Sequence, residues 1–351
     1  MFNDVELTFS NVELVFNDVE HKFSIAEHNF YLGPGILRVC KTRKVCYLCH
    51  LFVFMKTLTI FTPTYNRAHT LGRVYDSLCR QTSDDFEWLV VDDGSTDGTR
   101  SMVEAWQKEA PFTLRYIYKE NGGLYTGYNT AYLNIETELN VCIDSDDFMP
   151  PMAVERIVTL WNGRDRSREY AGITGLDFYA GTDKPIAGYF PEGMTEAYFL
   201  DLHIQNIHRG DSKQVMRTDL MRAVAPQVGF PGEKDFNPIY MLINVCDRYP
   251  VLLVNENFCF VEYQQGDSMS ANIYKQYMRS PRSFAKCRLQ EMTLRRSTTK
   301  NCWRSAIHYV AECIIARDGK WLSQSPRKLM TLCAVPFGIA LYGVIRWKTR
   351  K

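Results

Sequence analysis

The chain has 351 residues, of which 46% are hydrophobic and 23% charged, with a net charge of +1. This length and balance exclude a disordered chain and provide enough apolar surface for one large or two small domains. The eleven cysteines are odd in number and follow no repeating spacing. They therefore argue against a secreted disulfide framework and favour a reducing compartment, the cytoplasm.

A seven-residue repeat occupies residues 2–30, where Phe and Val recur at the seam positions of a heptad. Leu7 and Leu14 fall off that seam, and helix-favouring residues are few. We expect the folded protein to start near Met55. Residues 1–54 are then a low-complexity extension that is disordered or absent from the native protein.

Short β-rich runs alternate with amphipathic helical patterns from Met55 onward. The predicted strands are 57–61, 88–91, 113–118 and 140–143, and the predicted helices are 68–81, 99–109, 125–136 and 151–161. Such βαβα order predicts an α/β protein with an open, mainly parallel sheet covered by helices on both faces. Ligands of such sheets bind at the carboxyl ends of the strands.

A polar motif follows each of the four predicted strands. The motifs are Thr62–Arg67, Asp92–Thr99, Asn121–Gly123 and Asp144–Asp147. Each one alone is ordinary turn or helix-cap chemistry. Four such motifs on one edge of one sheet indicate a functional site.

The Asp144–Asp147 motif places three carboxylates at the end of a buried strand, where they repel one another and lose hydration. A cation is the natural reason to collect them, and oxygen ligands favour Mg²⁺ or Mn²⁺ over zinc. A short acidic pair that leaves metal positions open suits an ion shared with a diphosphate. The alternative is an acidic turn that caps the helix after Pro150.

Two common nucleotide-binding motifs are missing, because no GxGxxG follows the first strand and no P-loop lysine motif occurs. A carboxylate such as Asp93, beside the first loop, can instead accept a hydrogen bond from a pyrimidine ring N–H. That geometry selects uracil-like bases over purines.

The stretch Thr57–Trp161, with its four motifs in order, resembles the inverting nucleotide-sugar glycosyltransferases of family 2, which have the GT-A fold. The resemblance implies that Asp93 reads the base and that Asp146 of the Asp144/Asp146 pair holds the metal, with Asp144 near the ribose. The residues expected to line the nucleotide-sugar are Pro63, Thr64, Tyr65, Arg67, Asp92, Asp93, Asn121, Gly122, Gly123, Asp144 and Ser145. A solvated cation at the helix start is the alternative for Arg67.

A thinner resemblance continues beyond residue 166, to bacterial members that build surface polysaccharide. It rests on Gly210–Val215, Gly232–Lys234 and Tyr263–Ser270. An inverting transfer needs a carboxylate base on the opposite side of the sugar from the metal. Glu233 is the first candidate and Asp235 the second, and the alternative is that both acids begin the helix that runs toward Val245.

The C-terminal region is strongly basic, because residues 279–351 contain 16 Lys or Arg and only three Asp or Glu. Within it, Leu329–Ile345 is uncharged, seventeen residues long and interrupted by Pro336 and Gly338. This stretch is at the lower limit for a membrane span, and with basic residues on both sides it fits a helix or hairpin in the headgroup region of an anionic membrane. A C-terminal core helix with a basic end is the alternative.

The sequence therefore predicts a GT-A nucleotide-sugar-binding half at 55–165, an acceptor-side half at 166–275 and a basic helical tail at 276–351. The expected partners are a nucleotide-diphospho-sugar donor, a glycan or lipid-linked acceptor and an anionic membrane surface, with no nucleic acid. The expected location is the cytoplasm, either free or peripheral on the inner face of its membrane. A non-catalytic nucleotide-sugar-binding or scaffold protein of the same fold is the alternative function.

Overall fold

The computed structural model describes residues 56–204, 207–208, 210–262 and 273–350. The predictions for residues 1–54 and for Tyr263–Ser270 lie outside these ranges. The division into halves at residues 165 and 275 stays a prediction.

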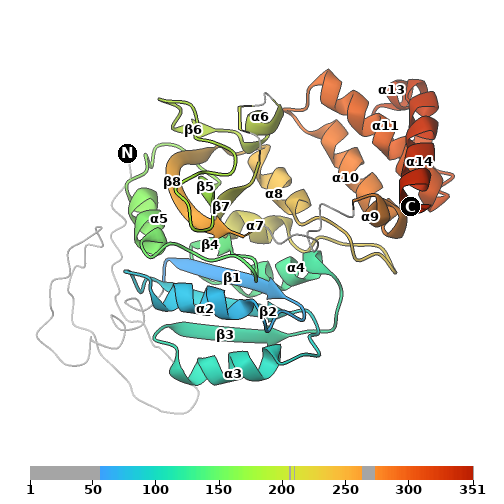
Figure 1. Ribbon diagram of the computed structural model, residues 1–351. Coiled ribbons are helices and arrows are strands. Elements are labelled where there is room, and N and C mark those ends of the chain that lie inside the picture. The colour runs from blue at the N-terminus through green and yellow to red at the C-terminus, as the bar shows by residue number, and fades with distance from the viewer. Residues whose placement is uncertain (1–55, 205–206, 209, 263–272, 351) are drawn as a thin grey trace, which may run out of the picture. The chain divides into compact units, whose positions relative to one another are not determined.

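One sheet of eight strands runs through the described chain, in the order β3-β2-β1-β4-β7-β5-β8-β6 (Figure 1). Its strands are β1 Leu58–Thr64, β2 Phe86–Asp92, β3 Thr113–Tyr118, β4 Leu139–Cys142, β5 Gly172–Tyr179, β6 Glu196–Ala197, β7 Ser212–Arg217 and β8 Val251–Val261. The first four strands pair in parallel, as do β5 and β8, whereas β7 is antiparallel to both β4 and β5. The predicted open, mainly parallel sheet is confirmed.

The helices that alternate with the first strands lie close to their predicted positions. They are α2 Leu71–Cys79, α3 Thr99–Glu109, α4 Leu124–Asn134 and α5 Ala153–Asn162. In the following segment the helices are α6 Phe199–Ile204, α7 Thr218–Val224 and α8 Ile239–Cys246. The predicted helix from Glu233 toward Val245 starts later, at Ile239.

Alternate residues of the central strands enter two different cores, as the pleat of a strand requires. Ile60 and Trp88 pack with α2, α3 and α5 on one face. Phe61 and Leu89 pack with α4, α6, α7 and α8 on the other. Both faces are therefore covered, and polar groups gather at the strand ends instead.

The C-terminal part is helical, with α9 Ile273–Arg279, α10 Pro281–Thr293, α11 Thr299–Ala316, α12 Trp321–Gln324, α13 Lys328–Cys333 and α14 Val335–Arg350. It has its own buried residues, including Met292 and Tyr309. Gly338 allows α14 to approach α11, because a Cβ at this position would meet the side chain of Val310 at 2.5 Å. Among the described residues, no helix has both the length and the apolar character needed to cross a bilayer.

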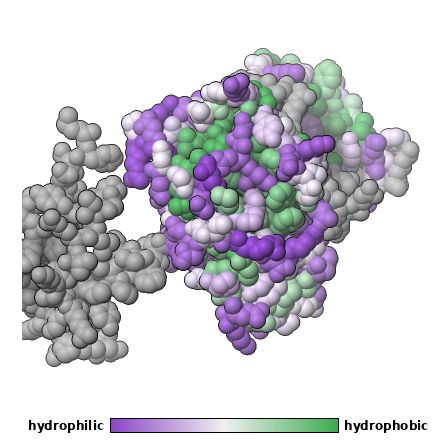
Figure 2. All heavy atoms as spheres, turned by 60° about the vertical axis from the view of Figure 1, so that its left-hand side comes forward, coloured by the Kyte–Doolittle hydropathy of each residue, from purple (hydrophilic) through white to green (hydrophobic). Residues whose placement is uncertain are grey.

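The uncharged stretch 329–345 forms no continuous helix, since α13 ends at Cys333 and α14 begins at Val335. Six large apolar side chains remain exposed on these two helices: Leu329, Leu332, Phe337, Ile339, Val344 and Trp347. The face of the molecule seen in Figure 2 interleaves hydrophilic and hydrophobic residues.

Candidate functional site

The loops after β1 and β2 are held together by Asn66, which adopts a positive φ of 54°. Its backbone N–H donates to Oγ of Ser95 at 2.9 Å, and its Oδ1 accepts from the backbone N–H of Thr96 at 2.8 Å. Asparagine tolerates this left-handed conformation better than most residues. The first two predicted motifs therefore meet at the carboxyl edge of the sheet.

Asp92 ends β2 and is fully buried. Its Oδ1 accepts from the backbone N–H of Ser95 at 2.7 Å, and its Oδ2 accepts from the hydroxyl of Tyr116 at 2.6 Å. Burial raises the pKa of Tyr116, and the bond to Asp92 raises it further. Asp92 therefore shapes the second loop from inside the fold.

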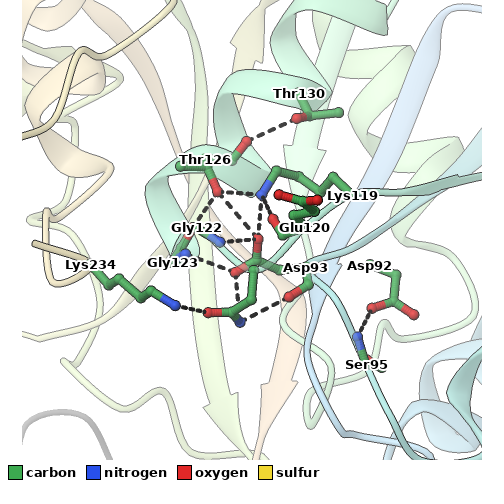
Figure 3. Close-up of polar contacts among 11 residues, drawn as sticks. Asp92, Asp93, Ser95, Lys119, Glu120, Gly122, Gly123, Thr126, Thr130 and Lys234 are labelled. Atoms are coloured by element: carbon green, nitrogen blue, oxygen red, sulfur yellow. Dashed lines mark hydrogen bonds and ion pairs between the residues drawn. The ribbon is translucent and has the colours of Figure 1, made fainter. Parts of the chain in front are cut away.

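Asp93 is the centre of a hydrogen-bond network that joins the loops after β2 and β3 (Figure 3). Its Oδ1 accepts from the backbone N–H of Gly122 at 2.9 Å and from Nζ of Lys119 at 2.5 Å. Its Oδ2 accepts from the backbone N–H of Gly123 at 2.8 Å and from Nδ2 of Asn121 at 3.2 Å. The side chain is only 7% exposed. Asp93 thus holds Asn121–Gly123 in place, and its role in reading a base stays a prediction.

Lys234 connects the segment before α8 to this network. Its Nζ donates to Oδ1 of Asn121 at 2.6 Å. Gly123 has a φ of +93°, and a Cβ there would collide with the backbone carbonyl of Lys234. Both the conformation and the close approach require glycine at this position.

The predicted residues of the first loop differ in exposure. Pro63 and Thr64 are buried in β1, with Gly127 of α4 close against Pro63. The Tyr65 side chain is 49% exposed. The Arg67 carbonyl accepts a hydrogen bond from the backbone N–H of Leu71 at 3.0 Å, at the start of α2. Tyr65 is therefore the first-loop side chain most open to a ligand.

The acidic turn after β4 separates its carboxylates. Asp144 is exposed and Asp146 half-buried, whereas Ser145 and Asp147 are buried. Desolvation by the surrounding protein raises the pKa of Asp144, and Asp146 adds to this while Lys213 opposes it. Burial also raises the pKa of Asp147 above its usual range, and the positive charge of Lys213 opposes this rise.

The acid pair Asp144 and Asp146 has the chemistry of a partial Mg²⁺ or Mn²⁺ site. Mutual repulsion disfavours the ionised pair, and a divalent cation would relieve it. Within residues 56–350 as described, no three His, Cys, Asp or Glu side chains gather closely enough to hold a metal alone. Two carboxylates with open coordination positions fit an ion whose remaining oxygens come from a diphosphate and water.

The two candidate bases, Glu233 and Asp235, contact the helical tail. Both carboxylate oxygens of Glu233 accept backbone N–H groups at the start of α10, from Arg282 at 3.1 Å and Ser283 at 2.7 Å. Asp235 accepts two bonds from the guanidinium of Arg279, at 3.0 and 3.1 Å. Sequence reasoning anticipated a helix start as the alternative role, but not that the helix would be α10.

Lys213 at the start of β7 lies beside the acidic turn, which sequence reasoning missed. Its Nζ lies 3.8 Å from Oδ2 of Asp147 and 3.9 Å from Oδ1 of Asp177. All three side chains are at least about nine-tenths buried. The feature of the sequence that could have indicated it is a single lysine at the start of a strand that continues into core residues such as Val215.

The strand order places all four motifs along one edge. β1 lies between β2 and β4, and β3 lies beside β2, so Asp93 and the Asp144/Asp146 pair follow strands on either side of β1. The hydrogen bonds described above join the loops after β1, β2 and β3. The predicted grouping of the motifs is a property of this topology.

Residues 59–174 match the sequence family described as glycosyl transferase family 2. An uncharacterised glycosyltransferase of Nostoc sp. is 32% identical over 130 residues, which is 37% of this chain and 39% of that protein. Chondroitin synthase of Pasteurella multocida is 35% identical over 98 residues, 28% of this chain and 10% of the synthase. The matches thus span well under two thirds of these relatives.

A solved structure of S. aureus TarS, residues 1–349 in complex with UDP-GlcNAc, has a similar fold. It superposes with a TM-score of 0.52 over 84% of this chain and 91% of that chain, at 15% identity. At this identity the likeness concerns the fold alone. Residues 59–174 thus match glycosyl transferase family 2, and the described chain shares the GT-A fold of TarS.

Proposed function

We propose that the chain transfers a sugar from a nucleotide-diphosphate donor, a UDP-sugar, to a hydroxyl of a glycan or lipid-linked acceptor. The transfer would proceed with inversion, during synthesis of a cell-surface polysaccharide. The observation that supports this most is the placement of four polar strand-end motifs along one sheet edge of a family 2 domain. TarS was solved with UDP-GlcNAc, and we extend a uridine donor to this chain as part of the proposal.

The loops around Asp93 and Tyr65 would bind the nucleoside. The network centred on Asp93 fixes the backbone of Gly122 and Gly123 through hydrogen bonds of the chain itself. Pre-ordering lowers the entropic cost of binding. Asp144 and Asp146 would hold Mg²⁺ or Mn²⁺ against the diphosphate. A bound ion of this kind stabilises the negative charge that develops on a diphosphate leaving group.

Contacts favour Asp235 over Glu233 as the base that activates the acceptor hydroxyl. Glu233 is buried, and each of its oxygens accepts a backbone N–H of α10. The Asp235 side chain is 22% exposed and accepts from two side chains: the buried Ser280 hydroxyl at 3.1 Å and the guanidinium of Arg279, whose side chain is 64% exposed. An exposed arginine can move aside when an acceptor arrives, whereas the backbone of α10 cannot.

A second candidate function follows from the same contacts. If both acids serve only to hold the tail helices, the chain is a nucleotide-sugar-binding or scaffold protein without catalysis. The bond from Arg279 to Asp235 is the observation that favours this candidate. Product analysis separates the two, because only the enzyme forms a transferred sugar.

The test uses the full chain with UDP-sugars, Mn²⁺ and a panel of acceptors, and measures both UDP binding and transferred sugar. We expect Asp235→Asn to lose transfer by at least about a hundredfold while UDP binding is retained. Glu233→Gln should keep more activity and lose thermal stability. If Asp235→Asn transfers sugar at the wild-type rate, the catalytic base is Glu233 or another residue. If the wild type transfers no sugar with any donor and acceptor, the non-catalytic scaffold function is favoured.

We also propose that the tail contacts an anionic membrane surface. In α14 the exposed Phe337, Val344 and Trp347 lie at a helical spacing, and Arg346, Lys348 and Arg350 are exposed beside them. No acidic residue follows Asp318. Apolar side chains flanked by cations match the chemistry of an acyl-headgroup boundary that carries negative lipids.

A further inference from the structure

Lys213 lies between two buried aspartates that come from different strands. Asp147 belongs to the acidic turn after β4, and Asp177 lies near the end of β5. β7, which carries Lys213, pairs with both β4 and β5. The ammonium is therefore held at 3.8 Å from one carboxylate and 3.9 Å from the other by the sheet itself.

Neither aspartate is exposed enough to rely on water. Asp147 is 6% exposed and Asp177 is 3% exposed. Among the described residues, Oδ1 of Asp177 has no hydrogen-bond partner, so the nearby ammonium is its compensation. Buried carboxylates without a counter-charge are strongly unfavourable. Lys213 is thus the internal counter-ion of both.

The position of Asp147 sets the conformation of the turn that carries Asp144 and Asp146. The backbone N–H of Asp147 donates to the carbonyl of Asp144 at 3.1 Å, which closes the turn. With Asp147 directed inward to Lys213, Asp144 remains exposed and Asp146 half-buried. An unpaired Asp147 would instead turn toward water and carry the neighbouring residues with it.

We infer that Lys213 is a positioning residue for the metal pair: it neutralises Asp147 and Asp177 inside the fold, so that Asp144 and Asp146 are the carboxylates presented to a divalent ion. This inference rests on the proposed function, because it assumes that the pair binds a metal. Asp147, the third acid of the turn, then has a structural role and is not a metal ligand.

The inference predicts that removing Lys213 weakens metal binding, which is the opposite of what local electrostatics alone predicts. Removing a positive charge close to a metal site should strengthen metal binding if only the local potential matters. If Lys213 positions the turn, the same change should weaken binding, because the ligands lose their arrangement. Residues that orient metal ligands typically contribute about tenfold or more to affinity.

The experiment measures Mn²⁺ affinity by titration calorimetry and by the electron paramagnetic resonance signal of free Mn²⁺, with UDP present. Lys213→Met should bind Mn²⁺ about tenfold more weakly than the wild type. Lys108→Met, a change at an exposed lysine of α3, is the matched control and should bind normally. Equal or tighter binding by folded Lys213→Met would overturn the inference.

Two further variants provide a test if Lys213→Met does not fold. Asp147→Asn with Asp177→Asn leaves Lys213 as an unpaired cation beside the site and should weaken Mn²⁺ binding. Adding Lys213→Met to this pair removes that cation and should restore binding by at least about threefold. No difference between the double and triple variants would contradict the role of Lys213. A wild type that binds no Mn²⁺ would instead contradict the proposed metal site.

Discussion

Nζ of Lys234 donates a 2.6 Å hydrogen bond to Oδ1 of Asn121, which joins the segment before α8 to the loop after β3. The same Asn121 donates through Nδ2 to the backbone carbonyl of Asp93 at 2.8 Å. Lys234 is flanked by Glu233 and Asp235, which contact α10 and Arg279. One short segment therefore touches both the proposed nucleoside loop and the helical tail.

Lys234→Met should weaken UDP binding by roughly three- to tenfold, because Asn121 loses the contact that orients its amide. The measurement is a calorimetric titration of UDP with Mn²⁺ present, and Lys108→Met provides the control. UDP affinity equal to that of the wild type would show that the Lys234–Asn121 bond does not contribute to the nucleoside loop.

Asp93→Asn should lower the free energy of unfolding by about 2 kcal/mol, because it leaves Lys119 without its carboxylate and turns an amide N–H toward the donors of Gly122 and Gly123. Denaturant unfolding measures this loss. Asp84→Asn changes an aspartate whose side chain is 90% exposed and should be neutral. A stable Asp93→Asn protein that fails to bind UDP would point to base reading as the main role of Asp93.

We expect the protein to lose stability at acid pH, because His308 in α11 is half-buried and has a lowered pKa. Burial, together with the positive charges of Arg288 and Arg304, lowers the pKa of His308 to about 4. In the unfolded chain its pKa is the ordinary 6.5, so between pH 6.5 and 4 the unfolded state binds the proton and the folded state does not. The contribution of His308 to stability should therefore be present above pH 6.5 and should fall by about 3 kcal/mol as the pH drops to 4.

His308→Gln removes this titration, so its unfolding free energy should decline less than that of the wild type over the same pH range. Glu312 acts in the opposite direction, since burial raises its pKa to about 8 and its ionisation destabilises the fold as the pH rises. The difference between wild type and His308→Gln cancels the effect of Glu312 to first order. Parallel pH profiles for the two proteins would contradict the assignment.

Phe337→Ser combined with Trp347→Ser should reduce sedimentation with anionic vesicles by about tenfold, because each side chain is more than half exposed and available to the bilayer. Tyr189→Ser, at a tyrosine that is 58% exposed on another part of the chain, is the control. Vesicles of neutral lipid should bind the wild type weakly. Failure of the wild type to sediment with anionic vesicles would leave the tail as a packing element.

Local pattern was sufficient to predict the first half of the fold. The alternation of strands and helices up to Asn162 is strongly periodic, so β3 and α3 have the predicted bounds and the other six elements differ from them by at most three residues at either end. The insertion of β7 between β4 and β5 was not predicted, because pairing between distant strands is a tertiary choice that leaves no local signal.

The sheet edge that carries the four motifs was predictable, but the contacts among them were not. The sequence shows that Asp93 follows a strand, but not that Lys119, Asn121 and two glycine N–H groups fill its oxygens. Sequence likewise shows Glu233 near a helix without showing which helix it contacts. Such partners depend on how loops from separate strands meet, which neither composition nor spacing encodes.

The account depends most on the Asp144/Asp146 pair binding a divalent ion together with the diphosphate of the donor. The direct measurement is a calorimetric titration of UDP into the full chain and into Asp146→Asn, each with Mn²⁺ and with a chelator. We predict that Mn²⁺ strengthens UDP binding to the wild type by at least about tenfold and has little effect on Asp146→Asn. The same Mn²⁺-dependent affinity in both proteins would contradict the account.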